Sequence, residues 1–155
     1  MATQWTAGTT SGQVLTAATL NTIGAAWETY TPAWTSTGVA PAIGNGSISG
    51  NWARINKTAF VNIFVVMGST TTYGNGNYRF SVPSGVTVNG NITHTGTALL
   101  YDASAGYPAV VGICTRVSGS TIDISPTGSN SVTNLLPFTW AINDQIRLML
   151  IYQTD

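Results

Sequence analysis

Apolar and polar residues alternate with a period of two along most of the chain, and residues 47–67 are the clearest example. In the second half of this stretch, apolar side chains fall on both faces of a strand: Val61, Ile63, Val65 and Met67 on one, and Phe60, Phe64 and Val66 on the other. A strand that is apolar on both faces is expected in the middle of a sheet that is covered on both sides. In the first half only one face is apolar, so the other side should meet water. The pattern predicts two long antiparallel strands joined by a turn at residues 56–57.

The same alternation predicts further strands, separated by segments rich in Gly, Pro, Asn and Ser. The predicted strands cover residues 29–35, 47–55, 58–67, 78–82, 91–101, 109–117, 121–125, 135–140 and 145–152. Pro32 marks the first as an edge strand, because proline cannot donate to a ladder. Strands spaced roughly 8 to 12 residues apart, with almost no helix, predict an all-β fold over residues 29–155, an antiparallel jelly-roll-like β-sandwich.

Residues 1–28 are predicted to form a separate arm with one short helix. Leu20, Ile23 and Trp27 recur at helical spacing after Thr16, a suitable N-cap. So short a helix is marginal alone and needs a surface to pack on. Two alternatives stay open: the arm closes one end of its own sandwich, or it docks on a neighbouring protein. The apolar residues expected to make the contact are Trp5, Val14, Leu15, Leu20, Ile23 and Trp27.

The chain carries few charges. Charged residues make up 6% of the sequence, and five Lys and Arg balance five Asp and Glu, whereas about 25% is usual in soluble domains. Five scattered cations cannot neutralise several phosphates, so nucleic acid is not an expected partner. An uncharged surface gives little repulsion between copies. The composition therefore favours a protein held in an assembly over one free in solution.

Titratable groups are too scattered in the sequence to indicate a catalytic site. The one histidine, His94, stands among hydroxyl residues and is expected to be an ordinary strand residue. Cys114 lies in an apolar run and is expected to be a buried thiol without a disulfide. Asp123 is expected to be the solvent-facing member of an alternating strand. We therefore expect no enzyme activity, no metal and no cofactor, although folding can still unite two of the internal carboxylates, which are Glu28, Asp102, Asp123 and Asp144.

No stretch approaches the roughly 18 to 20 apolar residues of a membrane span. The first residues also lack the cationic start and apolar core of an export signal. We expect a protein made in the cytoplasm, with no membrane partner.

Tyrosines give the one indication of a ligand. Tyr73 and Tyr78 flank a predicted loop, and Tyr107 lies in another. Aromatic rings at strand ends can stack on sugars, but core and subunit contacts use the same side chains, and we prefer that interpretation.

Two parts of the chain resemble known sequences. Gly12-Gln-Val-Leu-Thr-Ala-Ala-Thr-Leu-Asn21, followed by Trp27-Glu-Thr-Tyr-Thr-Pro-Ala-Trp34, resembles the amino-terminal segment common to small virion proteins of tailed bacteriophages. The stretches Ser47-Ile-Ser-Gly-Asn-Trp-Ala-Arg54 and Tyr78-Arg-Phe-Ser-Val-Pro83 resemble the β-rich domain of the same proteins. Together with the residues around them, the similar stretches span residues 6–83.

The resemblance implies a non-enzymatic virion structural protein made in the host cytoplasm, and it brings no catalytic residue. Our leading hypothesis is a capsid decoration or cement protein, a homotrimer on the capsid surface. Its arm, residues 1–28, would contact the major capsid protein, another virion protein or a neighbouring subunit. The alternative is a tail-fibre or baseplate adhesin that binds host cell-surface glycan through Tyr73, Tyr78 and Tyr107.

Overall fold

A computed structural model describes residues 26–106, 109–126 and 131–155. Within these ranges the chain forms nine strands and no helix: β1 (Glu28–Tyr30), β2 (Trp34–Ser36), β3 (Ser47–Ile55), β4 (Thr58–Val66), β5 (Tyr78–Ser81), β6 (His94–Tyr101), β7 (Ala109–Ser118), β8 (Thr121–Pro126) and β9 (Gln145–Gln153). The predicted arm helix falls outside the described residues, as do Trp5, Val14, Leu15, Leu20, Ile23 and Tyr107.

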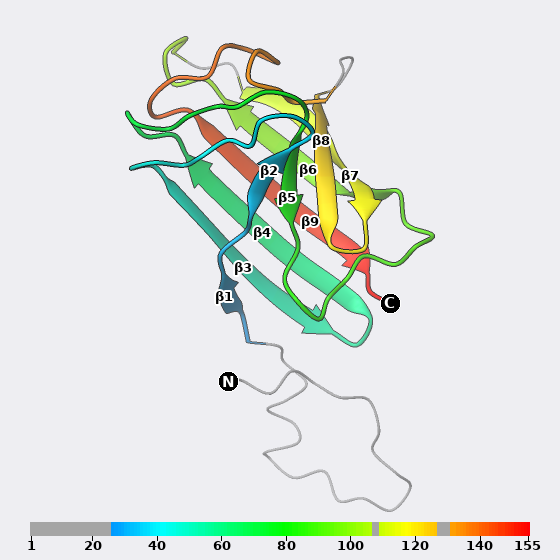
Figure 1. Ribbon diagram of the computed structural model, residues 1–155. Helices are drawn as coiled ribbons and strands as arrows, with labels where there is room; N and C mark the ends of the chain where they lie inside the picture. Colours follow the sequence, from blue (N-terminus) through cyan, green and yellow to red (C-terminus); the bar gives the residue numbers. More distant parts are fainter. Residues whose placement is uncertain (1–25, 107–108, 127–130) are drawn as a thin grey trace, which may run out of the picture.

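All nine strands belong to one antiparallel sheet, in the order β1-β3-β4-β9-β6-β7-β8-β5-β2. The sheet curls into a half-barrel, so that β2, β5 and β8 lie in front of β3, β4 and β9 in Figure 1. The all-β antiparallel class is thus confirmed. The separate sheets of a jelly-roll-like sandwich are not seen, because β7 pairs with both β6 and β8 and joins the two halves into one ladder.

The predicted edge strand at residues 29–35 is in fact two short strands. β1 pairs with β3 and β2 pairs with β5, so the two pieces lie at opposite edges of the sheet. Pro32 is buried between them. Because proline has no N–H to donate, the ladder cannot continue through this position.

The long hairpin predicted at residues 47–67 is confirmed. β3 and β4 pair from Ser47↔Val66 to Ile55↔Thr58. Asn56 turns the chain with φ 54, a left-handed conformation that asparagine tolerates well. Apart from residues 135–140, the other predicted strands also form, although β6 begins only at His94.

Residues 135–140, predicted as a bent strand, form a loop without strand pairing. Pro137 removes a ladder donor from the middle of this segment. The loop is instead fixed by Trp140, whose indole Nε1 donates to the Thr133 carbonyl at 2.8 Å. Phe138 packs on Trp140, with 4.6 Å between the ring centroids.

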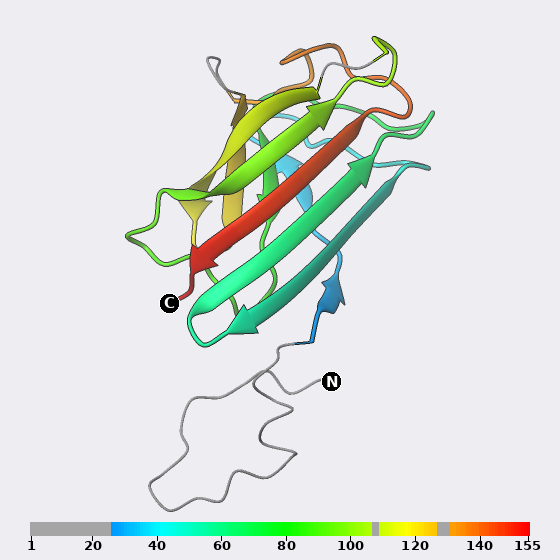
Figure 2. The ribbon, with the colours of Figure 1, turned by 180° about the vertical axis from the view of Figure 1, so that it is seen from behind.

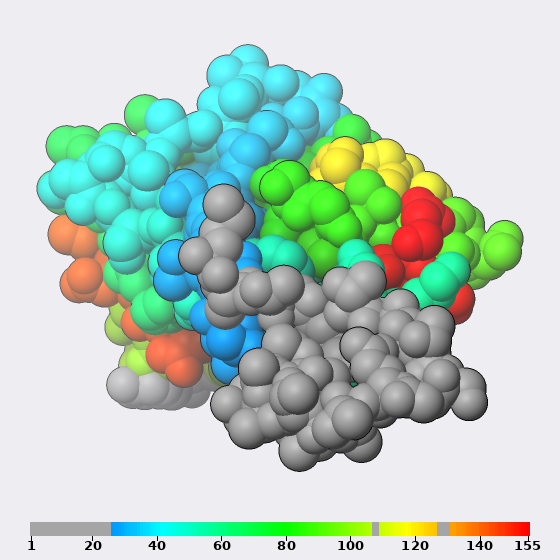
Figure 3. All heavy atoms as spheres, turned by 90° about the horizontal axis from the view of Figure 1, so that it is seen from below, coloured from blue at the N-terminus to red at the C-terminus, as the bar shows by residue number. Residues whose placement is uncertain are grey.

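The concave inner side of the sheet holds the core. Its buried side chains come from alternate strand positions and include Val61, Ile63, Val65, Tyr78, Phe80, Leu100, Ile122, Ile124, Ile146, Leu148 and Leu150. One end of the core is closed by the loop after β5, which Figure 3 shows in green beside the red carboxyl-terminal residues. There the Tyr152 hydroxyl donates to the Val86 carbonyl at 2.9 Å, and the Asn89 N–H donates to the Gln153 carbonyl, also at 2.9 Å.

Candidate functional site

The side of β3, β4, β9, β6 and β7 that points away from the core, called the outer face below, is open to solvent. Figure 2 looks onto it, and no other described segment crosses these strands. Large apolar side chains are exposed there: Met149 is 57% exposed and Val111 52%, and Phe64, Ile113 and Ile151 are also exposed. The sequence predicted that β4 is covered on both sides. Among the described residues only its inner side is covered.

Strand pairing sets the outer-face side chains in rows across the sheet. One row runs through Asn51, Asn62, Met149, Thr97 and Ile113, and the next through Ser49, Phe64, Arg147, Leu99 and Val111. Between these rows the surface forms a shallow trough of about 680 Å³. The trough is lined by uncharged side chains apart from a single arginine.

That arginine, Arg147, is the only Lys, Arg, Asp or Glu on the outer face of these five strands. Its Nε and Nη2 donate to the Gln145 Oε1 at 3.1 and 2.7 Å. Its guanidinium carbon lies 5.1 Å from the centre of the Phe64 ring, a distance that permits a cation–π attraction. The charge is therefore held close to the sheet by neighbours on its own face.

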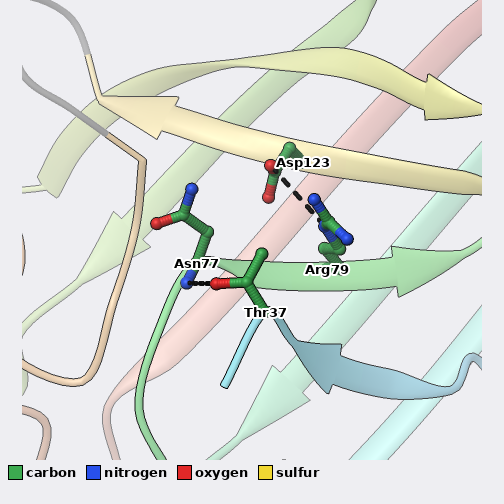
Figure 4. A network of polar contacts seen from close by, with 4 residues as sticks. All are labelled: Thr37, Asn77, Arg79 and Asp123. Atoms are coloured by element: carbon green, nitrogen blue, oxygen red, sulfur yellow. Dashed lines mark hydrogen bonds and ion pairs between the residues drawn. The ribbon is translucent and has the colours of Figure 1, made fainter.

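Asp123 is buried, contrary to the prediction that it faces solvent. It is 9% exposed, and its strand, β8, lies between β7 and β5 in the sheet. Figure 4 shows its carboxylate facing Arg79, with 3.8 Å between Asp123 Oδ2 and Arg79 Nε. Burial raises the pKa of Asp123, and the Arg79 charge offsets part of the rise. Nearby, the Thr37 hydroxyl accepts the Asn77 N–H at 2.9 Å.

Folding does bring two carboxylates together, Asp102 and Asp144. Burial, and to a lesser degree the charge of Asp102, raises the pKa of Asp144. Both groups are occupied by turn hydrogen bonds. Asp144 is fully buried and accepts the N–H groups of Ala103 at 2.9 Å and Ala141 at 2.6 Å, and Asp102 accepts the Ser104 hydroxyl at 2.7 Å. This pair fixes two loops beside the start of β9. Both carboxylates accept hydrogen bonds from nearby loop residues, as side chains that stabilise turns do.

The remaining reactive side chains are dispersed. His94 is exposed at the start of β6. Cys114 is completely buried, and burial raises the pKa of its thiol to about 12, which leaves little reactive thiolate at neutral pH. Nowhere in the described ranges do three or more His, Cys, Asp or Glu side chains gather as a metal site would require.

Tyr73 and Tyr78, predicted to flank one exposed loop, are not both exposed. Tyr78 belongs to the core with 0% exposure, and its hydroxyl donates to the Tyr73 carbonyl at 2.8 Å. Its ring cannot stack on an external sugar in this position. Tyr73 is half-buried and packs against the core. Among the arm residues singled out in the sequence, Trp27 is described and is exposed just before β1.

Comparison of the chain with protein-family models, curated proteins and solved structures found no match. In the parts of the chain that the structure describes, no helix is long and apolar enough to cross a membrane. The outer face is the candidate functional surface, because it exposes large apolar side chains around a shallow trough. This face was not identified as a site from the sequence. The apolar residues on the second face of β4 indicated a surface that needs a partner, but they were interpreted as a face covered within the chain.

Proposed function

We propose that this chain is a non-enzymatic virion structural protein of a tailed bacteriophage, a capsid decoration or cement protein that works by association. The observation that carries the proposal is the outer face, on which exposed apolar side chains surround a single charged residue, Arg147. Large apolar side chains exposed together on one face are typical of interaction sites, and here they alternate with uncharged polar ones such as Asn62 and Thr97. The link to a capsid comes from the sequence resemblance.

The energetic basis is burial of apolar area between subunits, worth about 25 cal/mol per Å² before the costs of association. The low charge of the chain adds little repulsion when copies gather at high density. The arm, residues 1–28, would contribute a second contact, to the major capsid protein or another virion protein. The resemblance implies a homo-oligomer. The leading hypothesis expects a trimer, whereas the two-fold contact inferred below predicts an even number of copies, so the molar mass of the purified chain separates the two.

A binding comparison tests the proposal. The purified full-length chain is mixed with expanded capsids of the parent phage and, separately, with host cells, and bound protein is measured after sedimentation. We expect saturable binding to capsids, visible as regular extra density in electron micrographs. Binding to host cells but not to capsids would overturn the proposal and favour the adhesin. In that case a Tyr73→Ala variant should bind the host glycan less well, because Tyr73 is the one described tyrosine of the proposed set with an exposed part.

A further inference from the structure

We infer that the outer face is the contact between two copies of this chain, packed sheet on sheet around a two-fold axis that passes close to Met149. The inference rests on the proposed function, since it takes the outer face to be an assembly surface and names its partner. The shape, the size and the charge of the face all favour this contact.

The shape of a twisted sheet fits a second copy of itself. The nine-stranded sheet curls around the core, but its five long strands also twist with one hand, and the twist gives their part of the sheet the form of a saddle. A saddle turned by 180° about an axis in its own plane superposes on its original shape. The hollow of one copy then meets the raised diagonal of the other, as in aligned sandwiches, in which two sheets pack about 10 Å apart with strands within about 30°. The trough of about 680 Å³ is the hollow that such a partner would fill.

The size of the face matches a stable dimer. β3, β4 and β9 each have nine residues. With a rise of about 3.4 Å per residue and strands about 4.8 Å apart, the five strands make a face of roughly 24 by 30 Å, or about 700 Å². A standard protein interface buries about 800 Å² on each partner. A contact confined to one loop would fall far short of this area.

The position of Arg147 favours one direction of the two-fold axis over the other. β9 is the middle strand of the five, and Met149 is the middle residue of β9. One choice of two-fold axis runs parallel to the sheet and crosses β9 at a right angle at Met149. This axis places Arg147 of one copy over Ile151 of the other. The two guanidinium groups are then separated by four residues of strand, about 13 Å, instead of facing each other. An axis along β9 would place the two arginines directly over one another.

The first experiment measures molar mass by size exclusion with light scattering, using the full-length chain and two lysine variants. Met149→Lys sets two lysines against each other at the axis, and because a like-charge pair in a desolvated contact costs several kcal/mol, we expect the dissociation constant to rise about 100-fold or more. Val39→Lys is the matched control: Val39 is 64% exposed and lies in the loop between β2 and β3, away from the outer face. We expect that variant to dimerise like the parent chain. Circular dichroism checks that both variants fold.

The second experiment locates the axis. Sheets about 10 Å apart exceed the reach of a disulfide, which needs Cα atoms about 4.4 to 6.8 Å apart, so Met149→Cys is treated with a short bismaleimide. A covalent dimer on a denaturing gel is expected for Met149→Cys and not for Val39→Cys. Buried Cys114 should stay unreacted in both.

Four results would overturn the inference: a monomeric parent chain, a trimer that Met149→Lys leaves intact, equal effects of the two lysine variants, or no covalent dimer of Met149→Cys. A chain that dimerises only after removal of residues 1–25 would assign the face to the arm instead. Capsid binding is measured separately with the Met149→Lys variant. A monomeric variant that still binds capsids supports both claims, whereas a dimeric parent chain that does not bind capsids contradicts only the proposed function.

Discussion

The two faces of β4 and β9 differ in their surroundings far more than in their residues. On the inner face Leu148 is 3% exposed and Leu150 is fully buried, while between and beside them on the outer face Met149 is 57% exposed and Ile151 51%. All four side chains are large and apolar. Alternation along a strand therefore tells which side chains share a face, but it does not tell what covers that face.

Apolar residues on the two faces of a strand can therefore stabilise different states of the protein. The inner face is buried by loops and strands of the same chain, so its side chains contribute to the stability of the monomer. The outer face has no such partner among the described residues, so its apolar side chains contribute little to folding. Their contribution is expected in the assembled state.

The largest expected effect compares Leu150 with its neighbour Ile151. Leu150→Ala leaves a cavity in the core and should lower the free energy of unfolding by about 2 to 5 kcal/mol. Ile151→Ala removes a similar volume from an exposed position and should change it by less than about 0.5 kcal/mol when the chain is monomeric. Urea denaturation of dilute protein measures both. Equal losses would show that the outer face is covered within one chain.

The second prediction concerns Gly96, at which the backbone of β9 leaves no room for a side chain on β6. A Cβ added here would lie 2.1 Å from the Met149 carbonyl oxygen and 2.7 Å from the Leu150 Cα. Because both neighbours are backbone atoms, Gly96→Ala must push the strands apart and should cost about 2 to 3 kcal/mol. Gly90→Ala is the control, since no atom lies within 4 Å of an added Cβ. A stable Gly96→Ala protein would mean that the pairing of β6 and β9 is looser than described.

The third prediction concerns Asp144, which fixes the loops at one end of both faces. Asp144→Ala leaves the N–H groups of Ala103 and Ala141 without their acceptor and should cost about 1 to 3 kcal/mol. Hydrogen exchange of these two amides should accelerate, because their protection depends on the carboxylate. Amides in the middle of β4 should exchange as in the parent chain, and acceleration there as well would indicate a global loss of structure.

The sequence predicted most of the strands because residues such as Val61 and Ile63 alternate cleanly with exposed positions. It did not predict that Pro32 splits the first strand between two edges, since that depends on which distant strands lie beside it. It also placed Asp123 in solvent, because alternation puts Asp123 opposite the buried Ile122 and Ile124 but is silent on how far neighbouring strands bury it. The outer face was missed as a site for the same reason: local periodicity does not show what covers a sheet.

The smallest expected effect is a change of stability with pH that follows from the burial of Asp123. Burial raises its pKa above the ordinary value of 3.8, so the folded state binds this proton more tightly than the unfolded state does. The resulting stability is fully present below pH 3.8 and is lost as the pH rises through the folded pKa. Relative to an Asp123→Asn variant, which cannot titrate, the parent chain should therefore become less stable across this window and then level off.

Urea denaturation of both proteins from pH 3 to 7 measures that difference. Asp102→Asn is the control of opposite sign, because hydrogen bonds led by the Ser104 hydroxyl lower the pKa of Asp102, so the parent chain should gain stability relative to that variant as the pH rises. If the Asp123 difference also rises with pH, the attraction of Arg79 outweighs the cost of burial. The pair would then stabilise its side of the sheet as an ion pair, in contrast to the outer face of β4 and β9, whose one charged residue is Arg147.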